Sequence, residues 1–374
     1  MVKIANLPLF IVFVLVVSSN FCCSSNNVSI SDIHFMDISE SRDASISDID
    51  LNEDIKVDVL QHDKYFAISF EDNTLKFFDR EKSSEQPFFS VNSKGEISSL
   101  EYIADEDMIV FSDLGSKEVV FLKKFIEYKR IQNVGNFPYS MRYIPKIKLL
   151  IVPDKSSNRL YVFDTEKMEL SNISPMTAGG NYPISICYDD KPLTQGLIVR
   201  LMILNYGSLT VRAYDIFDKD NWGFRSEQLP TLAEPSDIAC DSENRRLLVV
   251  NSGSNNISVY GLDDLVQIPN SPFEAGKNPT YAAIYSSASV AYVTNTSDDS
   301  LTIFSTVEMK AKGGINFKPQ DRPTRVYVNG SEKRLYVLLS GAKSLIIYSI
   351  ENPMVPEKIS QIIFTSTPKE LIYR

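Results

Sequence analysis

A pattern of about 45 residues recurs seven times along the chain and constrains its fold more than any other feature. Each copy has a short apolar strand, a polar turn and a second strand rich in aliphatic and aromatic residues, as in 291–304 (AYVTNTSDDSLTIF). The first strands close on Ser69, Asp113, Asp154, Asn205, Asn251, Asn295 and Leu339, in steps of 44, 41, 51, 46, 44 and 44. Extra residues around 191–197 explain the long step. Such a period indicates a repeat architecture.

Prolines in register with the repeat support this count. They precede the later copies and follow the last one, at Pro138, Pro183, Pro235, Pro279, Pro323 and Pro368. About 45 residues supply four short strands, and a sheet that is apolar on both faces must stack on others to bury them. No long segment shows the 3.6-residue periodicity of a helix. The sequence therefore predicts an all-β fold, a seven-bladed β-propeller of four-stranded blades.

The start of the chain predicts a targeting signal followed by a tether. Lys3 precedes an 11-residue apolar run, Leu7–Val17, which is short for a membrane span and typical of a secretory signal. We expect a signal peptide over 1–25, a Ser/Asp-rich tether over 26–52 and the propeller over 53–374. An uncleaved N-terminal anchor is the alternative. Residues 1–54 carry eight acidic and two basic residues, more than half of the net charge of −10.

A pair of cysteines follows the apolar run and precedes a Ser/Asn stretch. This segment resembles the start of a bacterial lipoprotein, which implies lipidation at Cys22 or Cys23. Simple cleavage after Ser19 is the competing interpretation. Both place the protein outside the cytoplasm, in the bacterial periplasm or on the outer surface. We expect contact with a membrane only through a lipid or an N-terminal anchor.

Tyr292-Val293-Thr294-Asn295 is the tetrapeptide that names the YVTN β-propeller repeat family, and the repeat region is similar to that family. The resemblance covers about 53–374. It implies a seven-bladed propeller of the kind found in bacterial and archaeal envelope and surface proteins. Related lactonase-type propellers include sugar-lactone hydrolases, but no catalytic motif of that group is matched here. No catalytic residue is therefore assigned.

The tail, 368–374, begins an eighth copy of the proline-led strand. Either this tail or the segment 33–38 (IHFMDI) is expected to complete a blade built from both ends of the chain. Such a seam would join the first and last blades through backbone hydrogen bonds.

The chain contains few of the side chains that commonly serve in catalysis or metal binding. The chain has two histidines; His34 falls in the tether, and His62 is expected to be a solvated turn residue. Cys187 and Cys240 lie four and five residues after their prolines, so we expect them to face opposite sides of their strands and to be buried free thiols. The segment 218–223 begins like a calcium loop, but Trp222 and Leu229 occupy ligand positions. We assign no metal and no cofactor.

A candidate binding surface comes from the loops that lead into the proline-led strands, because such loops converge around the central channel of a propeller. They carry polar and aromatic residues suited to contacts. Simple packing at the channel mouth is the alternative role. Trp222, expected in a separate long loop, is a candidate protein contact. The channel-mouth candidates are Tyr139, Arg142, Asn181, Tyr182, Asp237, Asn278, Tyr281, Arg322 and Arg325.

The acidic balance argues against a nucleic-acid partner, since phosphate binding favours a basic face. The leading hypothesis is an exported, monomeric, non-enzymatic cell-envelope propeller that binds or scaffolds other envelope proteins. One alternative is a lactonase-like hydrolase that acts on a small lactone at the channel mouth. Another is a surface adhesin or surface-layer component. Convergent charged groups with perturbed pKa values would favour an enzyme, and a broad exposed apolar patch would favour a protein binder.

Overall fold

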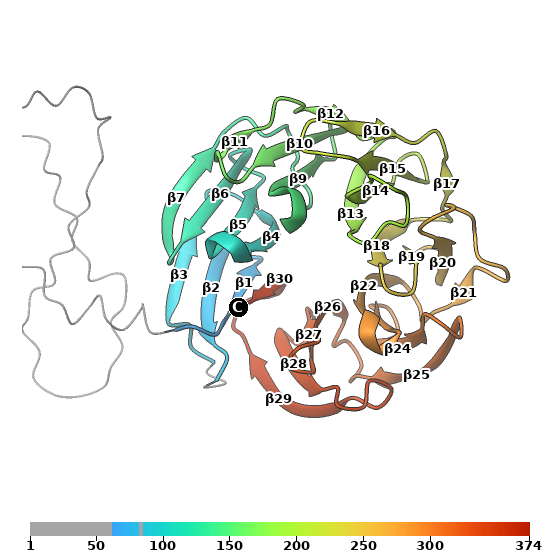
Figure 1. Cartoon of the computed structure of the whole chain (residues 1–374). Coiled ribbons are helices and arrows are strands. Elements are labelled where there is room, and N and C mark those ends of the chain that lie inside the picture. Colours follow the sequence, from blue (N-terminus) through green and yellow to red (C-terminus); the bar gives the residue numbers. More distant parts are fainter. Residues whose placement is uncertain (1–61, 82–84) are drawn as a thin grey trace, which may run out of the picture. The chain divides into compact units, whose positions relative to one another are not determined.

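The computed structural model describes residues 62–81 and 85–374. Seven antiparallel sheets follow one another in a ring (Figure 1), which confirms the predicted seven-bladed propeller. Within the described residues, the helical elements are three short 3₁₀ turns, η3 (Ala104–Glu106), η4 (Pro145–Ile147) and η5 (Ser286–Ala288). No helix in this part of the chain is long and apolar enough to cross a membrane.

Each blade has an innermost strand at the channel and three or four strands outside it. The innermost strands are β4 (Ile97–Ile103), β8 (Arg142–Ile144), β13 (Pro183–Asp189), β18 (Pro235–Asp241), β22 (Pro279–Tyr285), β26 (Pro323–Asn329) and β30 (Pro368–Tyr373). The second strands are β1 (Tyr65–Phe70), β5 (Met108–Asp113), β9 (Leu149–Asp154), β14 (Val199–Asn205), β19 (Arg246–Asn251), β23 (Val290–Asn295) and β27 (Arg334–Leu339). Six of these seven close on the residue that the repeat predicts, and β1 runs one residue further.

The outer strands complete the sheets. The third strands are β2 (Thr74–Asp79), β6 (Glu118–Lys123), β10 (Arg159–Asp164), β15 (Thr210–Ile216), β20 (Asn256–Gly261), β24 (Ser300–Ser305) and β28 (Ser344–Ser349). The outermost are β3 (Phe89–Asn92), β7 (Ile126–Ile131), β11 (Glu169–Leu170), β16 (Trp222–Phe224), β21 (Phe273–Glu274), β25 (Lys310–Asn316) and β29 (Glu357–Ile363). Two short strands, β12 (Met176–Thr177) and β17 (Leu229–Pro230), extend the third and fourth blades.

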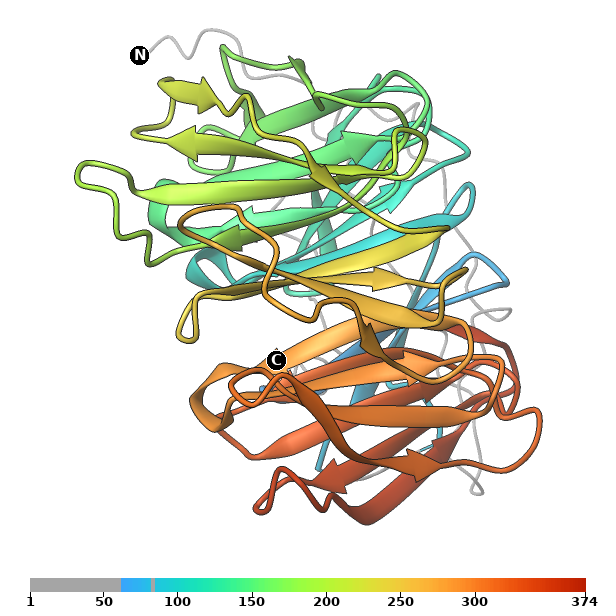
Figure 2. The ribbon, with the colours of Figure 1, turned by 90° about the vertical axis from the view of Figure 1, so that its right-hand side faces the viewer.

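The hydrophobic core lies between the blades. Each of the seven clusters of buried apolar side chains draws on two neighbouring blades. Figure 2 shows the sheets stacked in this way from the side. Because both faces of every sheet are covered, the second strands are apolar along their length rather than alternating. This packing is the physical reason for the apolar runs in the repeat.

The two ends of the described chain meet in one blade. β30 pairs antiparallel with β1, with Leu371 opposite Ile68 and Tyr373 opposite Phe66. The expected closing strand is therefore the tail, 368–374. The other candidate, 33–38, lies outside the described residues, as do Cys22, Cys23, His34 and the predicted leader and tether.

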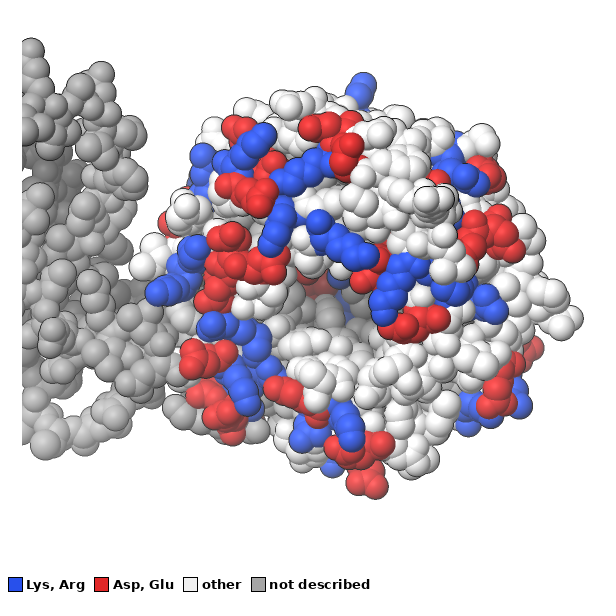
Figure 3. All heavy atoms as spheres, in the orientation of Figure 1, with Lys and Arg blue, Asp and Glu red and all other residues white. Residues whose placement is uncertain are grey.

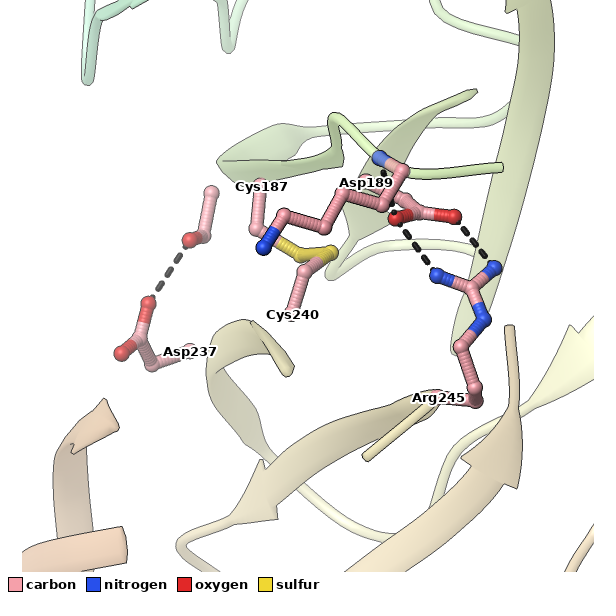
Figure 4. The surroundings of a disulfide bond; sticks show 7 residues. Cys187, Asp189, Asp237, Cys240 and Arg245 are labelled. Atoms are coloured by element: carbon pink, nitrogen blue, oxygen red, sulfur yellow. Dashed lines mark hydrogen bonds and ion pairs between the residues drawn. A yellow bond between two sulfur atoms is a disulfide. The ribbon is translucent and has the colours of Figure 1, made fainter. Parts of the chain in front are cut away.

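The expectation of free thiols at Cys187 and Cys240 is wrong, because the two form a disulfide between β13 and β18 (Figure 4). Their Cα atoms lie 5.6 Å apart. The prediction assumed that two residues that face opposite sides of their strands stay apart, which is true within a single sheet. In a propeller, the sheets of neighbouring blades face each other, so a residue on one face of its sheet can meet a residue on the opposite face of the next sheet.

Two aromatic positions also differ from expectation. His62 is not a solvated turn residue: its side chain is 11% exposed, its Nδ1 lies 3.0 Å from Asp79 Oδ2, and its ring stacks on Phe88. Trp222 opens the strand β16 instead of a free loop, and its ring packs against Tyr214. The Trp222 indole N–H donates to the Lys219 carbonyl, 3.1 Å away. The rings of His62 and Trp222 therefore both contribute to the packing within their blades.

Candidate functional site: the central cavity

A β-bulge recurs where the innermost strands begin. In the blades of β13, β18, β22 and β26, the proline pairs with the last residue of the second strand, and the next recorded pair skips one residue. The blade of β4 has the same shift, with Ile97 in the place of the proline. A bulge re-aims the side chains that follow it. The residue two positions after the proline is in every case part of the channel wall.

These residues form a layer around a cavity of about 870 Å³. Each blade contributes one member, and the layer combines hydroxyl, carboxyl, phenol and guanidinium groups: Ser99, Ser140, Ser185, Asp237, Tyr281, Arg325 and Glu370. A volume of this size is in the usual range for small-molecule sites. The site is thus built from seven segments that are far apart in the sequence.

Two ion pairs lie in the cavity wall. Arg325 Nη2 lies 2.6 Å from Glu370 Oε1, and the Arg325 Nε–H donates to the same oxygen at 2.8 Å. Arg142 Nη1 lies 3.5 Å from Glu101 Oε2. The Arg142 side chain is 40% exposed and lines the cavity. Arg142 can therefore offer N–H donors to a ligand in the cavity.

Asp237 has the most unusual environment in the wall. It is 5% exposed, and its carboxylate accepts hydrogen bonds from the Ser185 hydroxyl at 2.7 Å and from the Ala282 backbone N–H at 3.1 Å. Burial raises the pKa of Asp237 to about 6, against the opposing effect of these two donors and of Arg325 and Arg142. Asp237 can consequently gain or lose a proton close to neutral pH.

Burial also affects other groups in the cavity wall. It raises the pKa of Glu101, although Arg142 opposes the change. It raises the pKa of Tyr281 to about 12, so this phenol remains protonated at neutral pH. The Tyr327 hydroxyl donates to Glu370 Oε2 at 2.9 Å and accepts a hydrogen bond from the Leu371 N–H. The wall therefore contains ordered donors and acceptors of both charge signs.

Part of the cavity lining is aromatic. Phe137 and Tyr139 stack with ring centroids 5.9 Å apart, and the Lys155 ammonium lies 4.8 Å from the Tyr139 ring and 5.9 Å from that of Tyr206. Small hydroxylic residues such as Ser252 and Thr280 also line the cavity. The lining thus combines apolar and polar surface.

A second, smaller cavity of about 390 Å³ shares Arg142, Asp237, Tyr281, Tyr327 and Tyr373 with the first. These shared side chains therefore stand between the two spaces. Figure 3 shows one face of the ring, with a hollow at its centre in which charged atoms are visible. The smaller cavity is also lined by both cysteines of the disulfide.

The structure brings six of the nine sequence-predicted channel residues to the larger cavity: Tyr139, Arg142, Asp237, Asn278, Tyr281 and Arg325. Asn181, Tyr182 and Arg322 are exposed and lie outside its lining. The backbone N–H groups of Tyr182 and Arg322 instead bond the side chains of Asn158 and Asp299 in the preceding blade. Their loops therefore link neighbouring blades.

Sequence reasoning missed Ser99, Glu101, Ser185, Tyr327 and Glu370. Ser185 and Glu370 stand two residues after Pro183 and Pro368, as Asp237 does after Pro235. That constant offset from the proline is a signal that could have found them. Ser99 and Glu101 lack it, because Ile97 replaces the proline in their blade.

No group of three or more His, Cys, Asp or Glu side chains suited to a metal ion occurs in residues 62–81 and 85–374. In the segment 218–223, Asp218 Oδ1 accepts hydrogen bonds from the backbone N–H groups of Asp220 and Asn221. The Asp218 carboxylate thus holds its own turn together.

No model of a protein family matches the chain, and no curated protein matches it in sequence. Solved structures match the fold. A protein from Bacteroides uniformis, provisionally described as a 6-phosphogluconolactonase, superposes with a TM-score of 0.68 at 12% identity, covering 84% of this chain and all of its own.

A second protein with that provisional description, from Bacteroides fragilis, gives a TM-score of 0.66 at 13% identity, over 84% of this chain and 98% of its own. A protein of unknown function from Desulfotomaculum acetoxidans gives 0.64 at 11% identity, over 83% and 98%. At these identities the likeness shows the fold alone. The chain is a seven-bladed β-propeller whose structural neighbours include lactonase-like propellers.

Proposed function

We propose that this protein binds a small, neutral, polar molecule in the central cavity. The observation that carries the proposal is the convergence of Glu101–Arg142, Asp237 and Arg325–Glu370 on one space of about 870 Å³. Acidic and basic groups are both present, so the wall fits a ligand with several hydrogen-bonding groups better than a strong anion or cation. Buried polar groups of this kind give orientation and specificity to a ligand site.

Arg142 provides the test of this site. A panel of hydroxylated ring compounds and cyclic esters is screened for a rise in melting temperature, and the affinity of each hit is measured by calorimetry. Arg142→Met should weaken binding by about 10- to 100-fold, because it removes hydrogen bonds from a charged donor. Arg159→Met, on the exposed side of β10, is the matched control and should leave the affinity unchanged. Equal affinity of both variants, or a panel without any binder, would refute the proposal.

Hydrolysis of a lactone is the second candidate function, favoured by the titration of Asp237 near pH 6 beside two arginines. Ionised Asp237 would take a proton from a water molecule that attacks the lactone carbonyl. A guanidinium would stabilise the resulting oxyanion; its collapse would break the ring C–O bond, and protonated Asp237 would return the proton to the leaving oxygen, which gives a hydroxy acid. The lactonase-like structural neighbours support this candidate through their fold alone.

A pH profile tests this candidate. The rate of lactone opening should rise as the pH passes through about 6 and should fall by about 100-fold or more in Asp237→Asn. Hydrolysis at the buffer rate by the wild-type protein would eliminate the enzyme and leave ligand binding intact.

Export to the cell envelope also stays part of the proposal. The Cys187–Cys240 disulfide supports it, because such bonds persist mainly in oxidising compartments. Mass spectrometry of the mature chain would check it: the first residue should follow the apolar run, and acylation at Cys22 or Cys23 would add mass. A full-length chain in the cytoplasmic fraction would contradict export.

Scaffolding of other proteins has less support. The exposed large apolar side chains lie on the outer strands and loops of several blades, including Ile126 and Tyr128 of β7 and Ile359 and Ile363 of β29. They do not belong to a single blade. Binding to envelope proteins, adhesion and the monomeric state remain predictions.

A further inference from the structure

Three side chains on one face of β13 link it to the next blade. Ser185, Cys187 and Asp189 occupy alternate positions and therefore point to the same side of the strand. Ser185 donates to Asp237, Cys187 bonds Cys240, and Asp189 accepts two hydrogen bonds from Arg245, at 2.8 and 2.5 Å. Figure 4 shows the disulfide between the other two links.

Of these three contacts between β13 and the next blade, the disulfide is the covalent one. Ser185 stands two residues before Cys187 on β13, and Asp237 stands three residues before Cys240 on β18. The Ser185–Asp237 hydrogen bond, 2.7 Å long, is lost once its oxygen atoms move beyond about 3.5 Å, and a disulfide prevents its two Cα atoms from moving more than about 7 Å apart. The covalent bond is thus placed to limit the separation of β13 and β18 near this contact.

We infer that the Cys187–Cys240 disulfide is a positioning element of the central cavity: by fixing β13 against β18, it keeps the Ser185 hydroxyl on the Asp237 carboxylate. The inference holds whatever ligand occupies the cavity. Breaking the bond lets the two strands separate, so Asp237 keeps the Ala282 N–H donor and loses that of Ser185.

The charged and titratable neighbours of Asp237 come from other blades and are not tied to the disulfide. They are Arg142 on β8, Tyr281 on β22 and Arg325 on β26. Their charges should stay as they are when the bond is broken, so the loss of one hydrogen bond is the main change at Asp237. Because that bond favours the ionised form, its loss should raise the pKa of Asp237.

The test follows the carboxyl carbon of Asp237 by NMR in protein labelled with [γ-¹³C]aspartate, without ligand, and Asp237→Asn assigns the signal. The disulfide is removed in two ways. One is the double variant Cys187→Ala/Cys240→Ala. The other is reduction by dithiothreitol, a dithiol that gives two electrons and two protons to the bond, becomes a disulfide itself and leaves two cysteine thiols.

Both treatments should raise the midpoint of Asp237 by about one pH unit, the effect expected from one lost hydrogen bond. Ser185→Ala should give a rise of similar size, and removal of the disulfide in that background should add nothing, because the contact is already gone. Arg245→Met removes the two hydrogen bonds to Asp189, the third contact between β13 and the next blade, and is the matched control. It should lower stability and leave the midpoint of Asp237 unchanged.

An unchanged midpoint in the folded, reduced protein would overturn the inference. A shift of equal size in the Ser185→Ala background would do the same, because it would act by another route. Since no ligand is added, neither result depends on whether the cavity binds one. Conversely, failure to find a ligand would leave this titration valid.

Discussion

Asp237 combines features that seldom occur together in one carboxylate: it is buried, it accepts two hydrogen bonds, and its pKa lies near 6. Folding therefore favours its protonated form, since the pKa in an unfolded chain is near the ordinary value of 3.8. The contribution of Asp237 to the free energy of unfolding is most favourable below about pH 4. It falls as the pH rises through about 6 and is constant at higher pH. Ionised Asp237 therefore lowers the stability of the fold, as residues of functional sites often do.

Asp237→Asn should accordingly stabilise the fold at pH 7 by about 1–3 kcal/mol and give little gain at pH 4. Urea unfolding at the two pH values measures the difference. Asp220→Asn, on an exposed turn, is the control and should change stability little at either pH. A loss of stability at pH 7 in Asp237→Asn would show that the hydrogen bonds to Asp237 outweigh its burial.

At the scale of the elements, an Asx side chain at the end of the second strand bonds the loop that leads into the innermost strand in five of the seven blades; these residues are Asp113, Asp154, Asn205, Asn251 and Asn295. Asp154, which is fully buried, accepts hydrogen bonds from the backbone N–H groups of Asn136 and Phe137 and from Ser157. Burial alone would raise the pKa of Asp154, but these bonds hold it below its usual value. Gly135, at a φ of +70°, gives the carboxylate room, because a Cβ there would lie 2.2 Å from Asp154 Oδ2.

Asp154→Ala should destabilise the fold by about 2–4 kcal/mol, because it leaves several buried donors without an acceptor. Asp154→Asn retains a carbonyl oxygen and should cost less. Denaturant unfolding compares the two. Since its pKa is lowered, the contribution of Asp154 should disappear as the pH falls through the acid range in the wild-type protein. Equal stability of the wild type and Asp154→Ala at pH 7 would contradict this role.

The elements also show what sequence could and could not predict. The repeat predicted where the second strands end, because burial on both faces leaves a periodic apolar run. The direction of the side chains at the channel is harder to predict, because the bulge after the proline changes it. The two-residue offset from the proline marks the channel residue, as for Glu370 after Pro368. Asn181, Tyr182 and Arg322 instead stand before their prolines and lie outside the cavity lining. Contacts between blades, such as Cys187–Cys240, depend on how sheets face each other, which the repeat does not encode.

On the scale of the whole molecule, the ring is closed by a strand from the other end of the chain. β30 supplies Glu370 to the cavity and the buried Leu371 to the core between the blades of β28 and β1. It pairs with β1 along its length. The tail thus serves the fold and the candidate site at once.

Deletion of 368–374 should lower the melting temperature by about 10 °C or more, because it opens the ring and exposes the edge of β1. Removal of Arg374 alone keeps β30 and is the control. Calorimetry measures both. An unchanged transition in the longer deletion would mean that β30 does not close the ring in solution.

We propose that the channel cavity is the functional site of the molecule. The decisive experiment is a crystal structure of the folded chain soaked with the tightest-binding compound of the screen. We expect ligand density between Arg142 and Asp237, with contacts to both side chains. Density confined to the outer strands, with the same cavity holding only water, would contradict this proposal.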